Sequence, residues 1–194
     1  MVNAEEKLLQ LFIQNKGYLL SKAINRNSML YLQLKKLLIT GTVERIKPGL
    51  YKHLDLAAKD EWEELALLYP EGLFCLYSAW DFYGLSTIIP SKHCIAFPNK
   101  TKVKILEYPP VQAFFWTDKL YQLEIENKGN FKMYSLEKSV CDAIKFRNKI
   151  GKHTMSEILR NYLKKKDKNL DKLLKVAKLM KMEKVLRDYI NILL

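Results

Sequence analysis

The sequence predicts an α+β fold, with helical segments at both ends of the chain and a small, mainly antiparallel sheet between them. Two patterns support this prediction. Leucine-rich runs at helical spacing occur within residues 4–38 and again after residue 135. Short runs rich in aromatic and β-branched residues, which are typical of strands, occur between residues 93 and 134. At 194 residues the chain suits one domain of middling size or two small ones.

Charge divides the chain in the same way. The formal net charge is +12, from 33 Lys and Arg against 21 Asp and Glu. Residues 1–56 carry nine basic and four acidic side chains, residues 57–140 nine and eleven, and residues 141–194 fifteen and six. A surplus of this size favours a polyanionic partner, with nucleic acid ahead of a membrane surface. Two basic ends predict two separable binding surfaces.

Composition also limits the compartment and the chemistry. Three cysteines occur without a CxxC pair, which predicts reduced thiols that pack in the core. No signal peptide and no membrane span are recognisable, so we expect a cytoplasmic protein without a membrane partner. His53, His93 and His153 lack the spacing of metal ligands, and no glycine-rich phosphate loop is present. The sequence thus indicates no metal and no cofactor.

The first 56 residues are expected to contain three helices and a hairpin. The helices cover residues 4–15, 20–25 and 28–38, and Asn27 or Ser28 can cap the third. Gly41 suits the left-handed turn after a helix end. Two strand-like pieces then flank Lys47-Pro48-Gly49, where Gly49 suits the third position of a type II turn.

This layout is that of a winged helix-turn-helix domain, predicted for residues 1–56. The third helix can enter a major groove, and the hairpin behind it, the wing, can lie along phosphates. For Lys35 and Lys36 taken individually, the alternative that each only solvates the exposed helix face remains open. The side chains expected to contact DNA are Arg26, Asn27, Ser28, Tyr31, Lys35, Lys36, Arg45, Lys47 and Lys52.

Residues 57–194 are predicted to form the second domain. Its strands are expected at residues 93–97, 103–108, 113–117, 121–126 and 131–135, with a turn at 127–130. Ser78 and Ser135 are expected to act as helix N-caps. Asp142 lies on an otherwise apolar helix, which predicts a structural pairing with a nearby Lys or Arg.

Three segments, taken in order, resemble the AbiEi antitoxins of type IV toxin–antitoxin systems. "GTVERIKPGLY" (41–51) is similar to the wing of that family, G-x-L-x-R-I-x-R-G-V-Y. "YSAWDFYGLSTIIP" (77–90) is similar to its S-A-L-x-x-H-G-L…P stretch. "MYSLEKSVCDAIKFRNKIG" (133–151) is similar to its segment with a serine, a T-x-x-D helix and a basic end before glycine. Pro48 and Tyr83 depart from this pattern, where the family often has Arg and His.

The resemblance implies a non-enzymatic antitoxin with two activities. Its winged helix would bind double-stranded DNA at its own promoter, and its second domain would counteract a nucleotidyltransferase toxin without forming a stable complex. The excess of fifteen basic over six acidic side chains in residues 141–194 separately favours an antitoxic surface on the C-terminal helices, represented by Lys164, Lys168, Lys172 and Lys175. The alternative is that these lysines only solvate a small helical bundle.

The sequence also allows two other functions. A winged-helix interaction module could instead bind RNA or a protein partner, without repression at an operator. A weaker pattern, Asp118 followed by Glu126-Asn127-Lys128, loosely matches the D…E-x-K of metal-dependent nucleases. It is disfavoured because Lys128 falls in the predicted turn rather than at the end of a strand.

Overall fold

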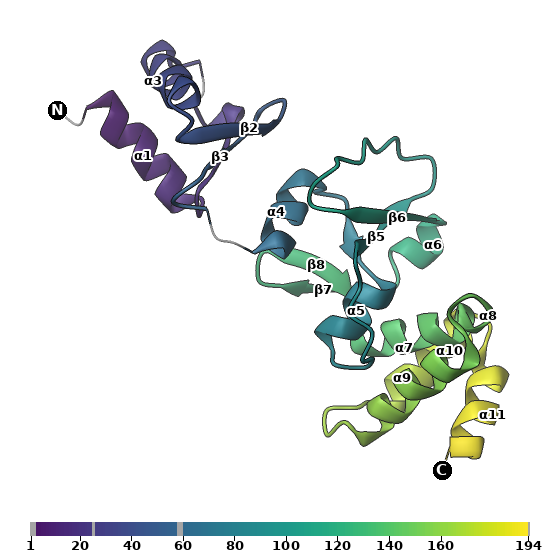
Figure 1. Cartoon of the computed structure of the whole chain (residues 1–194). Helices are drawn as coiled ribbons and strands as arrows, with labels where there is room; N and C mark the ends of the chain where they lie inside the picture. Colours follow the sequence, from purple (N-terminus) through teal and green to yellow (C-terminus); the bar gives the residue numbers. More distant parts are fainter. Residues whose placement is uncertain (1–2, 25, 58–59, 194) are drawn as a thin grey trace. The chain divides into compact units, whose positions relative to one another are not determined.

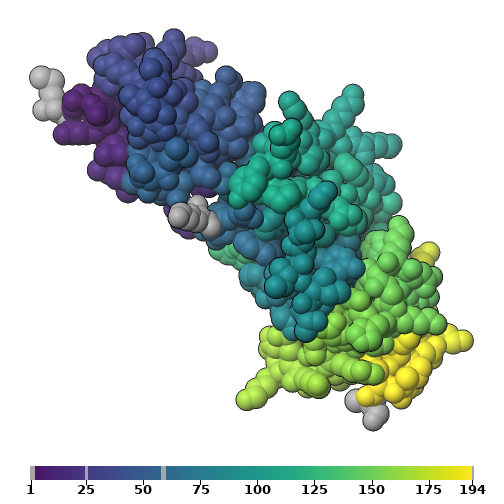
Figure 2. All heavy atoms as spheres, in the orientation of Figure 1, coloured from purple at the N-terminus to yellow at the C-terminus, as the bar shows by residue number. Residues whose placement is uncertain are grey.

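A computed structural model describes residues 3–24, 26–57 and 60–193 and divides the chain into two compact units (Figure 1). The N-terminal unit comprises residues 1–60 and the C-terminal unit residues 61–194, against a boundary predicted after residue 56. Figure 2 shows one face of the molecule with every heavy atom drawn as a sphere. In the described residues, no helix combines the length and apolar character that a membrane crossing requires. Because it contains helices and two sheets, the chain is an α+β protein.

The N-terminal unit places three helices against a three-stranded antiparallel sheet of order β1-β3-β2. The predicted helices and hairpin are present, although residue 25 lies outside the described residues. A short strand that the sequence did not predict, β1, joins the hairpin. The elements are α1 (Ala4–Gln14), β1 (Tyr18–Leu20), α2 (Ser21–Ile24), α3 (Ser28–Ile39), β2 (Val43–Lys47) and β3 (Leu50–His53).

Local sequence explains the limits of α3. The Asn27 side chain accepts a hydrogen bond from the Leu30 backbone N–H at 3.2 Å, which confirms the expected N-cap. Leu30 and Leu34 are buried with residues of α1 and β2 in one core. After α3, Gly41 has φ +73°, and at the tip of the hairpin Gly49 has φ +82°. Both glycines adopt the left-handed conformation that the turns require.

The C-terminal unit contains a five-stranded mixed sheet of order β6-β5-β4-β8-β7. Helices precede, interrupt and follow its strands. The elements up to the last strand are α4 (Glu61–Leu68), β4 (Leu73–Phe74), α5 (Leu76–Phe82), β5 (His93–Pro98), β6 (Val111–Trp116), α6 (Asp118–Tyr121), β7 (Ile125–Lys128) and β8 (Phe131–Tyr134).

The expectation of a mainly antiparallel sheet is wrong. β4 pairs with β5 and β7 with β8 in antiparallel fashion, but β4 with β8 and β5 with β6 are parallel. Parallel neighbours need a crossover of about a dozen residues. Residues 99–110 provide it between β5 and β6, so the strand predicted at 103–108 is instead part of this connection.

Five further helices of the described residues follow β8, and they form a group at the C-terminal end (Figure 1). They share one apolar core with the sheet, in which Trp80, Tyr134 and Tyr162 are fully buried. The Trp80 Nε1–H donates to the carbonyl oxygen of Ser139 at 2.8 Å, which fixes α5 against this group. The helices are α7 (Leu136–Lys145), α8 (Arg147–Ile150), α9 (Lys152–Lys164), α10 (Leu170–Leu179) and α11 (Glu183–Leu193).

The two serines that were expected to be helix caps differ. Ser135 does cap α7, because its Oγ accepts from the Lys138 backbone N–H at 3.3 Å. Ser78 lies inside α5, and its Oγ accepts from the Cys94 backbone N–H at 2.8 Å. The hydroxyl of Ser78 therefore connects α5 to strand β5, and the N-cap predicted there is wrong.

Candidate nucleic-acid interface

The exposed face of α3 carries the first group of predicted contacts. Tyr31, Lys35 and Lys36 follow Ser28 by three, seven and eight residues, which places all of them on one side of a helix. The structure exposes each of these four side chains, while Leu30 and Leu34 anchor the opposite side in the core. The helix itself has no acidic residue. A buried stripe thus holds a cationic, hydroxyl-bearing face outward.

Two predicted residues lie immediately before α3. Arg26 has φ +59°, a left-handed backbone that is uncommon for a residue other than glycine, and its side chain is exposed. Asn27 uses its carbonyl oxygen to cap α3, which leaves its amide NH₂ as the group suited to donate outward. The start of α3 therefore combines a fixed turn with a cation. In helix-turn-helix proteins, the N-terminal residues of the recognition helix contact base edges.

The hairpin contributes three cations of unequal exposure. Arg45 is exposed on β2, whereas Lys47 and Lys52 are half-buried. Burial lowers the pKa of Lys47. On β3, Lys52 lies between Glu44 of β2 and Tyr18 of β1, and its Nζ is 6.0 Å from the Tyr18 ring centroid. Among the hairpin cations, Arg45 is consequently the best placed to reach a phosphate.

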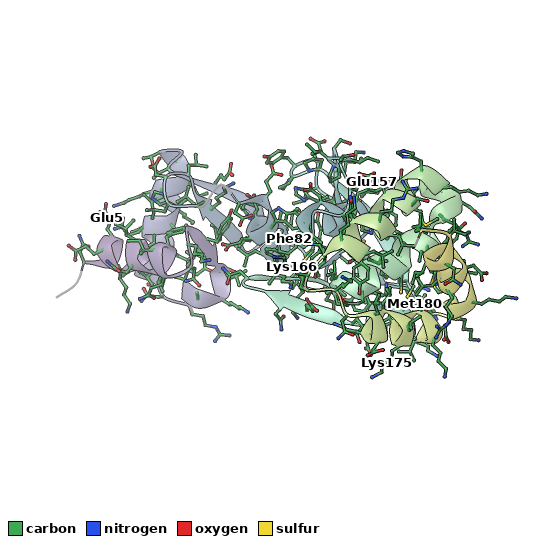
Figure 3. All side chains as sticks on the ribbon, turned by 90° about the horizontal axis from the view of Figure 1, so that it is seen from below. Glu5, Phe82, Glu157, Lys166, Lys175 and Met180 are labelled. Carbon is green, nitrogen blue, oxygen red and sulfur yellow. The ribbon has the colours of Figure 1, made fainter. Side chains whose placement is uncertain are left out.

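The four C-terminal lysines predicted as one basic surface do not share one environment. Lys164, Lys168 and Lys175 are exposed, and the side chain of Lys175 extends outward from α10 (Figure 3). Lys172 is half-buried and lies between three carboxylates. Its Nζ is 3.1 Å from Glu124, 3.4 Å from Glu126 and 3.4 Å from Glu137. Lys172 is thus a neutralised cation that ties α10 to β7 and α7.

Sequence reasoning missed a second basic row, on α9. Lys152, Ser156, Arg160 and Lys164 are spaced four residues apart and therefore lie along one face of this helix. They line a groove of about 440 Å³ together with His153, Glu157 and Asn161. The spacing of four was the available signal. The lysine-rich run from residue 164 onward dominates the local composition and masks this spacing.

Asp142 forms the structural pairing that the sequence predicted. Its two carboxylate oxygens lie 2.7 and 2.8 Å from the Nζ of Lys138, one helical turn earlier, and both side chains are almost fully buried. Burial raises the pKa of the Asp142 carboxyl, and the Lys138 ammonium opposes that rise. The same ammonium lies 4.3 Å from the ring centroids of both Trp116 and Tyr134.

In the nuclease-like pattern, the predicted position of Lys128 in a turn is wrong. Lys128 is the last residue of β7 and not part of the turn, and its Nζ is 2.8 Å from Glu126. Both Glu124 and Glu126 contact Lys172 as well. In the part of the chain that the structure describes, no three His, Cys, Asp or Glu side chains form a group that could hold a metal ion. Glu126 of this pattern therefore belongs to an ion-pair network with Lys128 and Lys172.

No family model fits the chain, and no curated protein is significantly similar to it in sequence.

Proposed function

We propose that the chain is a cytoplasmic, non-enzymatic DNA-binding antitoxin that represses its own promoter through a winged helix in the N-terminal unit. The element order α1-β1-α2-α3-β2-β3, with β3 central in the small sheet, supports the winged-helix assignment. The observation that carries the proposal is the exposed face of α3, which has no acidic residue and is followed directly by a hairpin with Arg45 outward. Such a face suits a major groove, and such a hairpin suits the phosphates beside it.

The antitoxin part of the proposal rests on the three segments that resemble the AbiEi family. The functional partner would be a nucleotidyltransferase toxin, without a stable complex between the two proteins. The exposed lysines of the C-terminal helices are the proposed antitoxic surface. Because Lys172 is already paired with three carboxylates, Lys164, Lys168 and Lys175 are the members of the predicted set that can meet an external anion.

Replacing Lys35 and Lys36 together with Ala should weaken binding to the DNA upstream of the gene and reduce its salt dependence. Each lysine that contacts a phosphate releases condensed counterion, so the slope of log K against log salt should fall by about one per lysine. Fluorescence anisotropy between about 50 and 200 mM salt measures both quantities. Affinity should fall to a similar degree on specific and unrelated DNA, because phosphate contacts carry no sequence information.

The matched control removes two exposed lysines of the C-terminal unit, Lys178 and Lys184, with the same substitution. Its DNA affinity and salt slope should equal those of the parent. If the Lys35/Lys36 double variant also keeps the parent's affinity and slope, α3 does not contact DNA in the proposed way.

Exposed apolar side chains on α3 support the alternative function of an interaction module. Three apolar side chains of α3 are strongly exposed: Met29 at 58%, Leu32 at 52% and Ile39 at 86%. An exposed apolar set of this kind is also suited to a protein partner. Binding to promoter DNA that does not weaken with salt, or no DNA binding at all, would favour this alternative.

Replacing Lys164, Lys168 and Lys175 with Gln should abolish protection against the cognate toxin while leaving promoter repression intact. Glutamine preserves helix propensity, so the variant should fold like the parent. Rescue of cells that express the toxin and a promoter–reporter assay give the two readouts. A control with Lys102, Lys104 and Lys132 changed to Gln removes the same charge from exposed positions outside the helical group. Full protection by the first variant would place the antitoxic site elsewhere.

A further inference from the structure

The C-terminal unit contains a small cavity of about 170 Å³ that the proposed function does not use. Asn99 and Thr117, which line it, directly follow β5 and β6. These two strands are parallel, and the Asn99 N–H donates to the Trp116 carbonyl oxygen at 2.7 Å. The carboxyl ends of β5 and β6 therefore lie side by side at one edge of the sheet. Ligands of α/β sheets bind outside the carboxyl ends of parallel strands.

Aromatic rings form much of the cavity wall. Trp116 is almost fully buried, and its ring stacks on Tyr134 with the centroids 4.9 Å apart. On the cavity wall Trp116 is joined by Phe146, whose ring plane is within 22° of that of the indole at a centroid distance of 6.4 Å. The indole is held in place by its packing, and half-buried Phe146 is the more accessible of the two aromatic residues. Flat, fixed aromatic faces favour a planar ligand that stacks.

The buried Lys138–Asp142 pair belongs to the same wall. Both oxygens of Asp142 accept from one ammonium, and a carboxylate has about four lone-pair sites, so acceptor capacity remains beyond this bond. Replacing a buried ion pair by apolar residues is often neutral or stabilising, so core stability alone does not call for charges here. A carboxylate that accepts and an ammonium that donates, side by side, match the amino and carbonyl groups on the edge of a base.

The volume of the cavity and the charge at its rim further limit the kinds of ligand that it can bind. At about 30 Å³ per water molecule, its volume corresponds to roughly five or six waters, which is enough for one small planar ring but not for a whole nucleotide. Lys145, also a lining residue, is exposed and provides a cation at the rim. A ribose and phosphate would therefore stay outside the cavity, with the phosphate near Lys145.

We propose that this cavity binds a nucleobase. The ring stacks against Phe146 beside the buried indole of Trp116, its polar edge meets Asn99 and the Lys138–Asp142 pair, and the attached phosphate pairs with Lys145. The base comes either from a free nucleotide or from an unstacked nucleotide of a single strand. The site lies wholly in the C-terminal unit, so it stands apart from promoter binding by α3.

Saturation-transfer NMR and calorimetry on the full chain test this site with the four ribonucleoside monophosphates and with single-stranded RNA of about eight nucleotides. At least one probe should bind with a Kd below about 1 mM. Asn99→Ala, at an exposed position, should weaken that binding about fivefold to tenfold, and Lys145→Gln should do the same. Asn148→Ala and Lys132→Gln, exposed residues outside the cavity, are the matched controls and should bind like the parent.

The unphosphorylated nucleosides separate the base contact from the phosphate contact. Lys145→Gln should weaken the monophosphate but leave the nucleoside unchanged, whereas Asn99→Ala should weaken both. Tighter binding of the monophosphate than of the oligonucleotide identifies a free nucleotide as the source, and the reverse order identifies a strand. The proposal is overturned if neither kind of probe binds below about 1 mM. It is equally overturned if Asn99→Ala and Lys145→Gln bind like the parent, because the contact then lies elsewhere.

Discussion

Asp142→Ala is expected to destabilise the protein by about 3–5 kcal/mol, because it leaves the buried Lys138 ammonium without its carboxylate partner. The two rings beside the ammonium, Trp116 and Tyr134, attract a cation but cannot accept strong hydrogen bonds in place of two carboxylate oxygens. Urea unfolding followed by circular dichroism gives the change in the free energy of unfolding. A loss of this size is a large part of the stability of a typical domain.

An exposed pair with the same spacing serves as the control. Glu183 and Arg187 are also four residues apart, with 2.8 Å between Oε1 and Nη2, but both are substantially exposed. Glu183→Ala should therefore cost less than about 1 kcal/mol. The double variant Lys138→Met with Asp142→Leu should recover most of the loss, since no unpaired charge stays buried. A cost near that of Glu183→Ala would show that water or rearrangement satisfies Lys138 in the single variant.

Local features of the fold were predictable where the cause is local. The cap at Asn27, the cap at Ser135 and the left-handed Gly41 each depend on residues within three positions. Ser78 shows where this reasoning ends, since the same residue type in a similar setting serves a strand 16 residues away. Nothing in the local sequence distinguishes a serine that caps a helix from one that bonds to a neighbouring strand.

Sheet topology and charge environment depend on contacts between distant segments. Strand propensity identified β5 and β6, but their parallel pairing follows from the long connection that joins them. In the predicted DNA contacts the sequence distinguished exposed from buried positions on α3, because helical spacing decides it. It could not separate Lys172 from Lys175. The three carboxylates around Lys172 come from residues 35 to 48 positions earlier in the chain.

Lys172→Gln should destabilise the protein by about 1–3 kcal/mol at neutral pH, although the sequence groups this residue with surface lysines. The substitution leaves Glu124, Glu126 and Glu137 without the ammonium that they share, and Glu137 is buried. Tyr162, whose hydroxyl donates to Glu137 at 3.3 Å, compensates only in part. The matched variant is Lys175→Gln on the same helix, whose exposed side chain should cost almost nothing.

The pH dependence of the stability difference between the parent and Lys172→Gln identifies the cause of that difference. Burial raises the pKa of Glu126, but the hydrogen bonds and charges of Lys128 and Lys172 outweigh burial, so the net pKa is lowered. A lowered carboxyl pKa contributes stability that is present above the unfolded value of 4.5 and is lost as pH falls through the folded value. The gap between parent and Lys172→Gln should therefore shrink below about pH 4.5, where protonation relieves the unpaired carboxylates.

At alkaline pH, the stability gap between the parent and Lys172→Gln depends on the pKa of Lys172 itself. Burial lowers the pKa of Lys172, but hydrogen bonds and charges from Glu124, Glu137 and Glu126 raise it more, to a net value above 10.5. A raised lysine pKa contributes stability that is complete below the unfolded value and is lost as pH rises through the folded value. The gap should thus stay constant between about pH 6 and pH 10, as thermal unfolding at each pH would show. A gap that does not change down to about pH 3 would assign the loss to packing of the lysine stem instead of to its charge.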